Sequence, residues 1–343
     1  MGALAVIGTG LVTPLARTPA QHAFFLRAEV GPPAPGAFVD GDGEPIPVAY
    51  CPWLDVRLDV AERLRALAVR AFADARSPLG RGERRTKPPL GVLAISGEPR
   101  AGLGEADRKA LEAMLAPASE HLVAQRFTGE AGFFAGLLHA ESLVTSGDVR
   151  AVALVAADSF VSRAYLAAQV RDMPSWEADS PRPAEGAAVV IVTTPAIARS
   201  EGIDVQATIH FAATRRGEAR DDDDAVIDGS AMAALLRGAS ESSRSIGACF
   251  GQHGVGELRQ RTWDMAAARC AGALEETCAL SSLETSVGRL GAAAGAAALA
   301  YGVAVQRHAA WPVDGDPRPE APILAWAISS DGLSGVCLAT VTI

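Results

Sequence analysis

Short runs rich in β-branched residues alternate along the chain with alanine-rich segments in which apolar positions recur at helical spacing. This alternation is typical of strands covered by helices and predicts an α/β layered fold. The expected strands are 3–8, 90–95, 151–156, 187–193, 204–212, 246–250, 322–329 and 335–342, and the expected helices are 59–76, 105–116, 131–146, 231–240, 262–275 and 291–306.

The order of these elements occurs twice. A strand, a helix with a following strand, a long alanine-rich helix and a closing strand pair occupy residues 1–193, and a shorter version occupies residues 204–342. Two similar fused halves that bury one common core would explain the repetition. We therefore expect a single domain over residues 1–343, with an N-terminal half 1–198 and a C-terminal half 199–343.

Composition narrows the class of protein. Of the 343 residues, 49% are hydrophobic, which is enough for a sizeable core. The net charge of −9 argues against a nucleic-acid or anionic-membrane surface, and no apolar run reaches membrane-spanning length. We expect a cytoplasmic protein.

The cysteines are odd in number and form no CxxC pair, so they predict neither a disulfide framework nor a zinc site. They are Cys51, Cys249, Cys270, Cys278 and Cys337.

Two acidic loops, 31–48 and 216–228, invite a calcium interpretation. The DGDGE sequence of the first lacks the twelve-residue spacing of an EF-hand, and the four consecutive aspartates of the second are typical of a solvated loop. The sequence contains no GxSxG elbow, GxGxxG loop or P-loop. We expect no metal and no cofactor.

Five motifs, in order along the chain, resemble those of the β-ketoacyl synthases, the condensing enzymes of the thiolase fold. They are VIGTGLVTPLARTPAQHAFFLRAEVG (6–31), SGDVRAVALVAADS (146–159), EGAAVVIVTTPAIARSEG (185–202), GRLGAAAG (288–295) and SSDGLSGVCLAT (329–340). The resemblance covers essentially the whole chain. It implies a thiolase-like, five-layered αβαβα fold and dimerisation through a strand near the nucleophile.

The resemblance places Glu130, within the sequence TGEAG, where the family has its nucleophilic cysteine. The family's cysteine lies at a helix N-terminus, whose dipole stabilises a thiolate. A carboxylate there cannot form a stable acyl thioester. Since no cysteine occurs between Cys51 and Cys249, the loss does not depend on the alignment.

The family's first catalytic histidine corresponds to His253 in GQHGVGE. Val255 and Glu257 replace the threonines of the family's HGTGT motif, and Asp264 lies too far along the chain to supply its downstream aspartate. His253 is therefore either a preserved pocket histidine or a histidine of a surface loop.

The family's second histidine corresponds to Arg289, which cannot titrate near pH 7. Glu284 takes the place of the family's lysine. In the terminal motif, Leu333 replaces a gating phenylalanine, Gly335 is a further substrate-binding candidate, and Cys337 replaces an asparagine. The catalytic positions of the family are thus mostly replaced.

If Glu130 and Arg289 both face the former pocket, they could form a buried ion pair that closes it. In addition, only residues 97–128 occupy the place of the family's longer cap, which predicts a reduced or absent substrate tunnel.

Three functions remain open at this point. The first is a non-condensing partner or scaffold subunit in a fatty-acid or polyketide-type pathway, as chain-length factors are. It would form a homodimer or a heterodimer with an intact ketosynthase, with acyl carrier protein as a further partner. The second is altered chemistry: a malonyl-thioester decarboxylase using His253 and Arg289, or an acyl transferase or hydrolase using Glu130 as general base. The third is an active condensing enzyme with Cys249 as nucleophile.

Overall fold

A computed structural model describes residues 2–31, 38–40, 43–77, 90–115, 121–122, 126–172, 182–217, 229–242, 246–308 and 321–343. The run of four aspartates at 221–224 and two residues of the DGDGE sequence lie outside the described residues. The calcium interpretation of these loops therefore stays untested.

The strands of the described residues are hydrogen bonded in the order β3-β2-β5-β6-β1-β7-β11-β10-β8-β9, with β4 also beside β2. Leu4–Val6 of β1 pair with Ala207–Ile209 of β7, and this short antiparallel contact joins the two halves of the path. The strands are β1 (Leu4–Val12), β2 (Leu90–Ser96), β3 (His121–Leu122), β4 (Phe127–Thr128), β5 (Ala151–Ser159), β6 (Glu185–Thr193), β7 (Ala207–Arg216), β8 (Ile246–Phe250), β9 (Leu274–Ser281), β10 (Ile323–Ile328) and β11 (Leu333–Val341).

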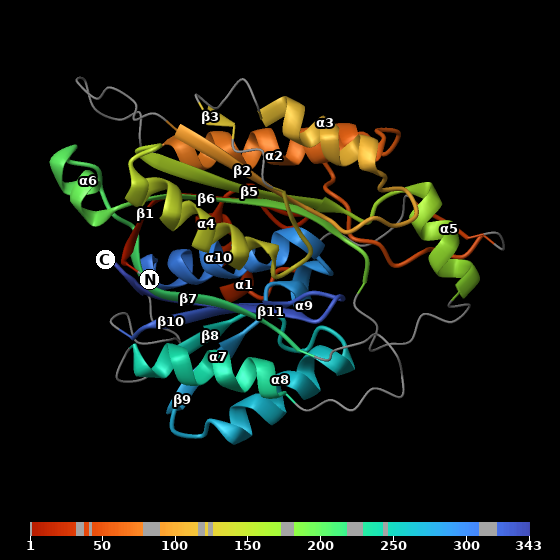
Figure 1. Cartoon of the computed structure of the whole chain (residues 1–343). Coiled ribbons are helices and arrows are strands. Elements are labelled where there is room, and N and C mark those ends of the chain that lie inside the picture. The colour runs from red at the N-terminus through yellow and green to blue at the C-terminus, as the bar shows by residue number, and fades with distance from the viewer. Residues whose placement is uncertain are drawn as a thin grey trace.

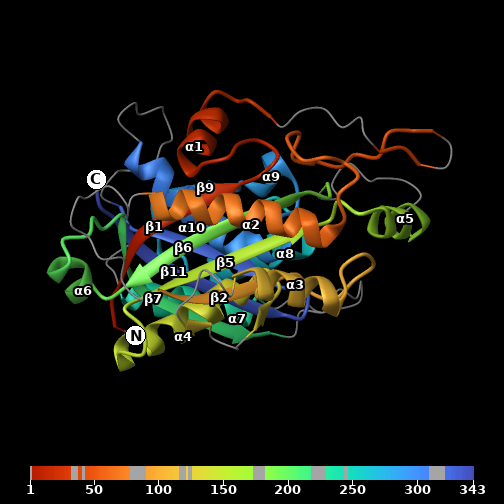
Figure 2. The same ribbon diagram turned by 90° about the horizontal axis from the view of Figure 1, so that it is seen from above.

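The helices separate these strands into layers, which Figure 1 shows from the side and Figure 2 from above. Helices α2 (Val60–Arg76) and α3 (Glu105–Leu115) cover one outer face, and α7 (Ser230–Glu241) and α8 (Glu257–Arg269) cover the other. Helices α4 (Gly132–Ser146) and α10 (Ala294–Arg307) lie between the two layers of strands. The expected five-layered αβαβα fold is confirmed. The remaining helices are α1 (Pro19–Arg27), α5 (Arg163–Asp172), α6 (Pro195–Ser200) and α9 (Glu284–Val287).

The central layer explains the small residues of the GRLGAAAG segment. Every residue of α10 from Ala294 to Gln306 is buried. A Cβ added at Gly295 would lie 2.9 Å from both the ring of Phe134 and the carbonyl oxygen of Glu130, and one at Gly302 would lie 2.7 Å from the ring of Phe250. The helix is therefore poor in large side chains because its neighbours approach its backbone.

A buried ion pair fixes the outer helix α2 to the sheet. Arg63 and Glu185 are both fully buried, and the Arg63 guanidinium donates to both carboxylate oxygens at 2.8 Å. The same carboxylate accepts hydrogen bonds from the Cys51 amide and the Ser159 hydroxyl. All four segments meet at Glu185, the first residue of β6, so this network positions the carboxyl end of β5.

The structure adds short elements that were not predicted, among them β3, β4, α5, α6 and α9, and it departs furthest from the expectation after β8. The helix expected over 262–275 begins earlier, after Gly256 with φ +79°, and ends at Arg269. Residues Leu274–Ser281 then form the unexpected strand β9. The division at residue 198 stays a prediction of domain organisation. Among the described residues, no helix is both long enough and apolar enough to cross a membrane.

Candidate functional site

The turn between β4 and α4 holds Glu130 in a fixed position. Gly129 adopts φ +75°, and a Cβ there would lie 2.6 Å from the hydroxyl oxygen of Ser329, so the turn requires glycine. The Ala131 amide donates to that hydroxyl at 2.8 Å. Glu130 therefore lies at the N-terminal end of α4, where the helix dipole favours negative charge.

Two arginines surround the Glu130 carboxylate, whose side chain is only 4% exposed. Nη2 of Arg289 lies 2.8 Å from Oε1, and Nη2 of Arg259 lies 3.1 Å from the same oxygen. Burial alone would raise the pKa of Glu130, but the two guanidiniums outweigh burial and hold that pKa below its ordinary value. The proposed Glu130–Arg289 ion pair is thus present in the structure. Its second arginine, Arg259 in the first turn of α8, was missed from the sequence.

A second ion pair lies beside the first, at the carboxyl ends of β2 and β5. The Arg100 guanidinium pairs with Asp158 and also donates to the carbonyl oxygen of Ser159 at 2.8 Å. Oδ2 of Asp158 accepts from the Ala292 amide at 3.0 Å. Gly291, with φ +54°, is needed here because a Cβ would lie 2.1 Å from Oδ2 of Asp158.

Neither Arg100 nor Asp158 was predicted from the sequence. Because β2 and β5 are parallel neighbours, their carboxyl ends meet at one edge of the sheet. Arg100 and Asp158 each follow an apolar run that was predicted as a strand, and this placement was the available indication of a shared site.

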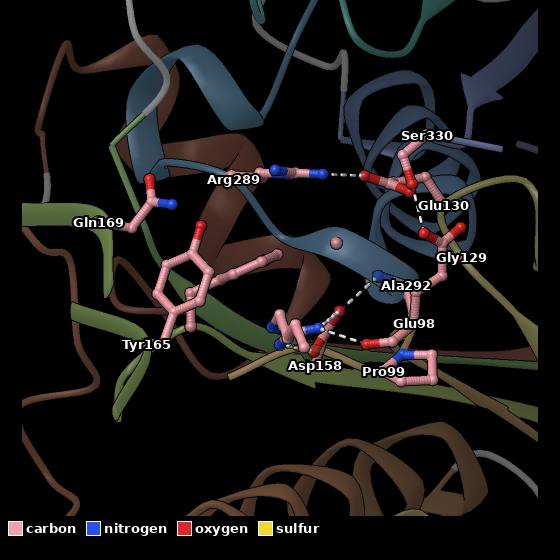
Figure 3. Close-up of a pocket in the computed structure, with 13 residues that line it drawn as sticks. Glu98, Pro99, Gly129, Glu130, Asp158, Tyr165, Gln169, Arg289, Ala292 and Ser330 are labelled. Atoms are coloured by element: carbon pink, nitrogen blue, oxygen red, sulfur yellow. Dashed lines mark hydrogen bonds and ion pairs between the residues drawn. The ribbon is translucent and has the colours of Figure 1, made fainter. Parts of the chain in front are cut away.

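These charges line a pocket of about 260 Å³ (Figure 3). Phe160 lies between the two arginines, with the Arg100 guanidinium 4.0 Å and the Arg289 guanidinium 5.0 Å from its ring centroid. Glu98 accepts a hydrogen bond from Ser330, and burial raises its pKa. The lining residues are Glu98, Pro99, Arg100, Gly129, Glu130, Asp158, Phe160, Tyr165, Gln169, Arg289, Gly291, Ala292 and Ser330.

His253 does not line this pocket. Its imidazole packs edge-on against two indoles, with ring centroids 4.7 Å from Trp263 and 4.9 Å from Trp326. Nε1 of Trp326 donates to Nε2 of His253 at 3.0 Å. Burial lowers the pKa of His253 to about 4, so the ring is neutral near pH 7. The structure does not bring His253 together with Glu130 and Arg289, and it places the residue in the interior rather than on a surface loop.

The three candidate substrate-binding residues also lie outside the pocket lining. Glu284 is buried at the start of α9, accepts from the Leu290 amide at 2.6 Å, and has its pKa raised by burial to about 7. Leu333 begins β11 and packs against the central core. A Cβ at Gly335 would lie 2.4 Å from the ring of Phe134, which explains this glycine by packing. Their substrate-binding roles stay predictions.

Cys249 lies within β8 and is fully buried, and burial raises its thiol pKa well above the ordinary value. It is not part of the pocket. Within the described ranges, no group of three or more His, Cys, Asp or Glu residues is arranged to hold a metal ion.

Ketosynthases are among the solved structures that share this architecture. The ishigamide ketosynthase/chain length factor matches with a TM-score of 0.69 and 19% identity, over 100% of both chains. The ketosynthase of a type II polyketide synthase, solved with its acyl-carrier protein (AntDE:AntF), matches with a TM-score of 0.76 and 13% identity, over 99% of this chain and 100% of that one. The chain has the ketosynthase fold.

A β-ketoacyl synthase from Burkholderia phymatum matches this fold with a TM-score of 0.72 and 14% identity over 100% of both chains. The sequence matches no protein-family model and no curated protein. The likeness is therefore one of structure, and the chemistry has to be argued from the residues of the pocket.

Proposed function

We propose that this chain is a non-condensing, ketosynthase-like subunit that acts as a partner or scaffold in a fatty-acid or polyketide-type pathway. The observation that carries the proposal is the Glu130 carboxylate held between Arg289 and Arg259 at the N-terminal end of α4. This is the position at which the resemblance expects an acyl-accepting cysteine. A carboxylate bound by two guanidiniums is a poor nucleophile, since its charge is already neutralised.

The size and character of the pocket agree with this proposal. Its volume of about 260 Å³ is small, and charged side chains such as Glu98, Arg100 and Asp158 form much of its wall. An apolar acyl chain would have to displace water from these charges without replacing their hydrogen bonds. We therefore expect no long acyl chain to bind beside Glu130.

The alternative chemistries have less support. A decarboxylase using His253 needs that imidazole in the pocket, whereas its Nε2 accepts from Trp326. A transferase or hydrolase using Glu130 as general base needs a pKa near 7, whereas the two arginines hold the Glu130 pKa below its ordinary value. Condensation through Cys249 needs an accessible thiol, and Cys249 is fully buried.

Assays with thioesters test whether the chain has lost acyl transfer and decarboxylation. We expect no change in intact mass and no carbon dioxide release when the protein is incubated with acyl- and malonyl-thioesters, while an intact ketosynthase in a parallel reaction becomes acylated. An acyl adduct on any residue, or carbon dioxide release that Arg289→Ala abolishes, would overturn the proposal in favour of altered chemistry.

The partner is tested separately. If the neighbouring genes encode an intact ketosynthase and an acyl carrier protein, those are the components to mix with this chain, and native mass spectrometry measures the complexes. We expect a heterodimer with the ketosynthase, to which the carrier protein adds. If this chain forms no complex with either component, the partner proposal fails even where the thioester assays are negative.

A further inference from the structure

Two cysteines meet across neighbouring strands in the half of the molecule that carries α7 and α8. Cys249 lies in β8 and Cys278 in β9, and their sulfur atoms are 3.6 Å apart. Both belong to the apolar cluster beneath α7 and α8, away from the pocket that contains Glu130. The proposed function uses neither thiol.

Their backbone allows the sulfurs to approach further. Strand β9 ends the strand path of the described residues, so it is held by β8 on one side only. The pairing of the two strands is irregular between Ile246–Leu274 and Ala248–Ala279, and Cys278 lies in the part of β9 that bulges there. A disulfide requires the sulfurs to move about 1.5 Å closer, to about 2.05 Å. A bulged edge strand can supply this movement without disturbing the sheet interior.

The two thiols differ in burial and in pKa, as the two members of a reactive pair must. Cys249 is fully buried, whereas Cys278 is only partly buried. The hydrogen bond between the two sulfurs lowers the pKa of Cys278, while burial raises the pKa of Cys249. The Cys278 sulfur is thus the better thiolate, and the buried Cys249 sulfur remains a thiol beside it.

We propose that Cys249 and Cys278 form an oxidant-reactive dithiol that closes to a disulfide between β8 and β9, with a hydroperoxide as the oxidant. The Cys278 thiolate attacks a peroxide oxygen; the S–O bond forms, the O–O bond breaks, and the leaving oxygen takes up a proton to become water or an alcohol. The Cys249 sulfur then attacks the sulfenic acid at Cys278. The S–S bond forms, the S–O bond breaks, and the departing hydroxyl takes the thiol proton and leaves as water. The peroxide gains the two electrons that the thiols lose.

The bond would close the segment from Cys249 to Cys278, which contains the whole of α8. Because Arg259 on that helix pairs with Glu130, oxidation would restrain the helix that supplies one of the two cations at Glu130. The proposal does not depend on the protein being non-condensing.

The test uses the full chain. After treatment with hydrogen peroxide, free thiols are alkylated under denaturing conditions and peptides are mapped without reduction. We expect one linked pair joining Cys249 and Cys278, lighter by two hydrogen atoms than the two free peptides. The pair should be absent in C278S and retained in C270S, a matched control because Cys270 lies in the same apolar cluster.

A second measurement guards against variants that fold poorly. The urea midpoint of the unmodified chain should rise on oxidation and return on reduction, and the midpoint of C278S should not respond. Alkylation of both cysteines after peroxide treatment would overturn the proposal. So would over-oxidation of Cys278 to sulfinic or sulfonic acid with Cys249 still alkylated.

Discussion

Removing either side of the Glu130–Arg289 ion pair should destabilise the protein, and removing both should cost less than the sum of the two single changes. Glu130→Ala leaves two cations without their carboxylate. Arg259 is 11% exposed and has little access to water, whereas Arg289 is 27% exposed and can turn toward the pocket. We expect a loss of about 3 kcal/mol, at the lower end of the cost of breaking a buried pair.

Arg289→Ala should cost less, about 1–2 kcal/mol, because Arg259 still neutralises Glu130. The coupling energy from the double-mutant cycle should be about 1–2 kcal/mol. Urea unfolding at pH 7 measures all four proteins. The exposed pair Arg261–Glu257, whose side chains are 64% and 72% exposed, is the control, and its coupling should lie near zero. Additive effects at Glu130 and Arg289 would refute the reasoning.

The same pair predicts a pH dependence with a definite sign. Because the folded-state pKa of Glu130 is lowered, its contribution is complete above the ordinary glutamate pKa and is lost as the pH falls through the folded value. The coupling energy should therefore stay constant from pH 7 down to about 5 and vanish only in stronger acid. A coupling that disappears above pH 5 would mean that the carboxylate is not held by the arginines.

Three further changes test neighbouring features. The pKa of Glu284 is raised to about 7, so the native protein should lose stability as the pH rises from 4.5 through 7, by up to roughly 3 kcal/mol. Urea unfolding of Glu284→Gln should not show this loss. If the stabilities of the native protein and the variant change with pH in parallel, the prediction is wrong. The pKa of His253 is lowered to about 4, so its neutral ring contributes stability above pH 6.5 that is lost as the pH falls toward 4. His253→Gln should lose less stability over this pH range, as measured by unfolding followed with tryptophan fluorescence. An unchanged pH dependence of stability would argue against a buried neutral ring. Gly335→Ala should cost about 1–3 kcal/mol in thermal unfolding, since its Cβ meets the Phe134 ring, and Phe134→Leu should recover part of the loss; no recovery would mean that the strain lies elsewhere.

The layered fold could be predicted because its central strands are apolar on both faces. β5 and β6 are buried along their whole length, and most of each strand is a continuous apolar run, AVALVAA and GAAVVIV respectively. Strand β9 was missed for the opposite reason. Its residues, LEETCALS, carry charge and are half-exposed because the strand lies at an edge.

The site could be predicted only where a motif fixed the position. Glu130 and Arg289 each lie within a recognisable turn, so their meeting was foreseeable. Arg259 reaches the same carboxylate from α8, whose start was placed too late along the chain. The direction of the His253 side chain depends on Trp263 in the following helix and on Trp326, which is distant in sequence, and no local pattern encodes that choice.

The arrangement around Glu130 has a consequence for small molecules. Two guanidiniums and the N-terminal end of α4 form a receptor for a carboxylate, and the chain fills this receptor with its own side chain. Cutting that side chain back in Glu130→Ala should leave a vacancy that formate or acetate can occupy. Either anion should then raise the thermal midpoint of the variant by mass action, and should raise that of the native protein far less. The protein thus occupies this anion site with a carboxylate of its own.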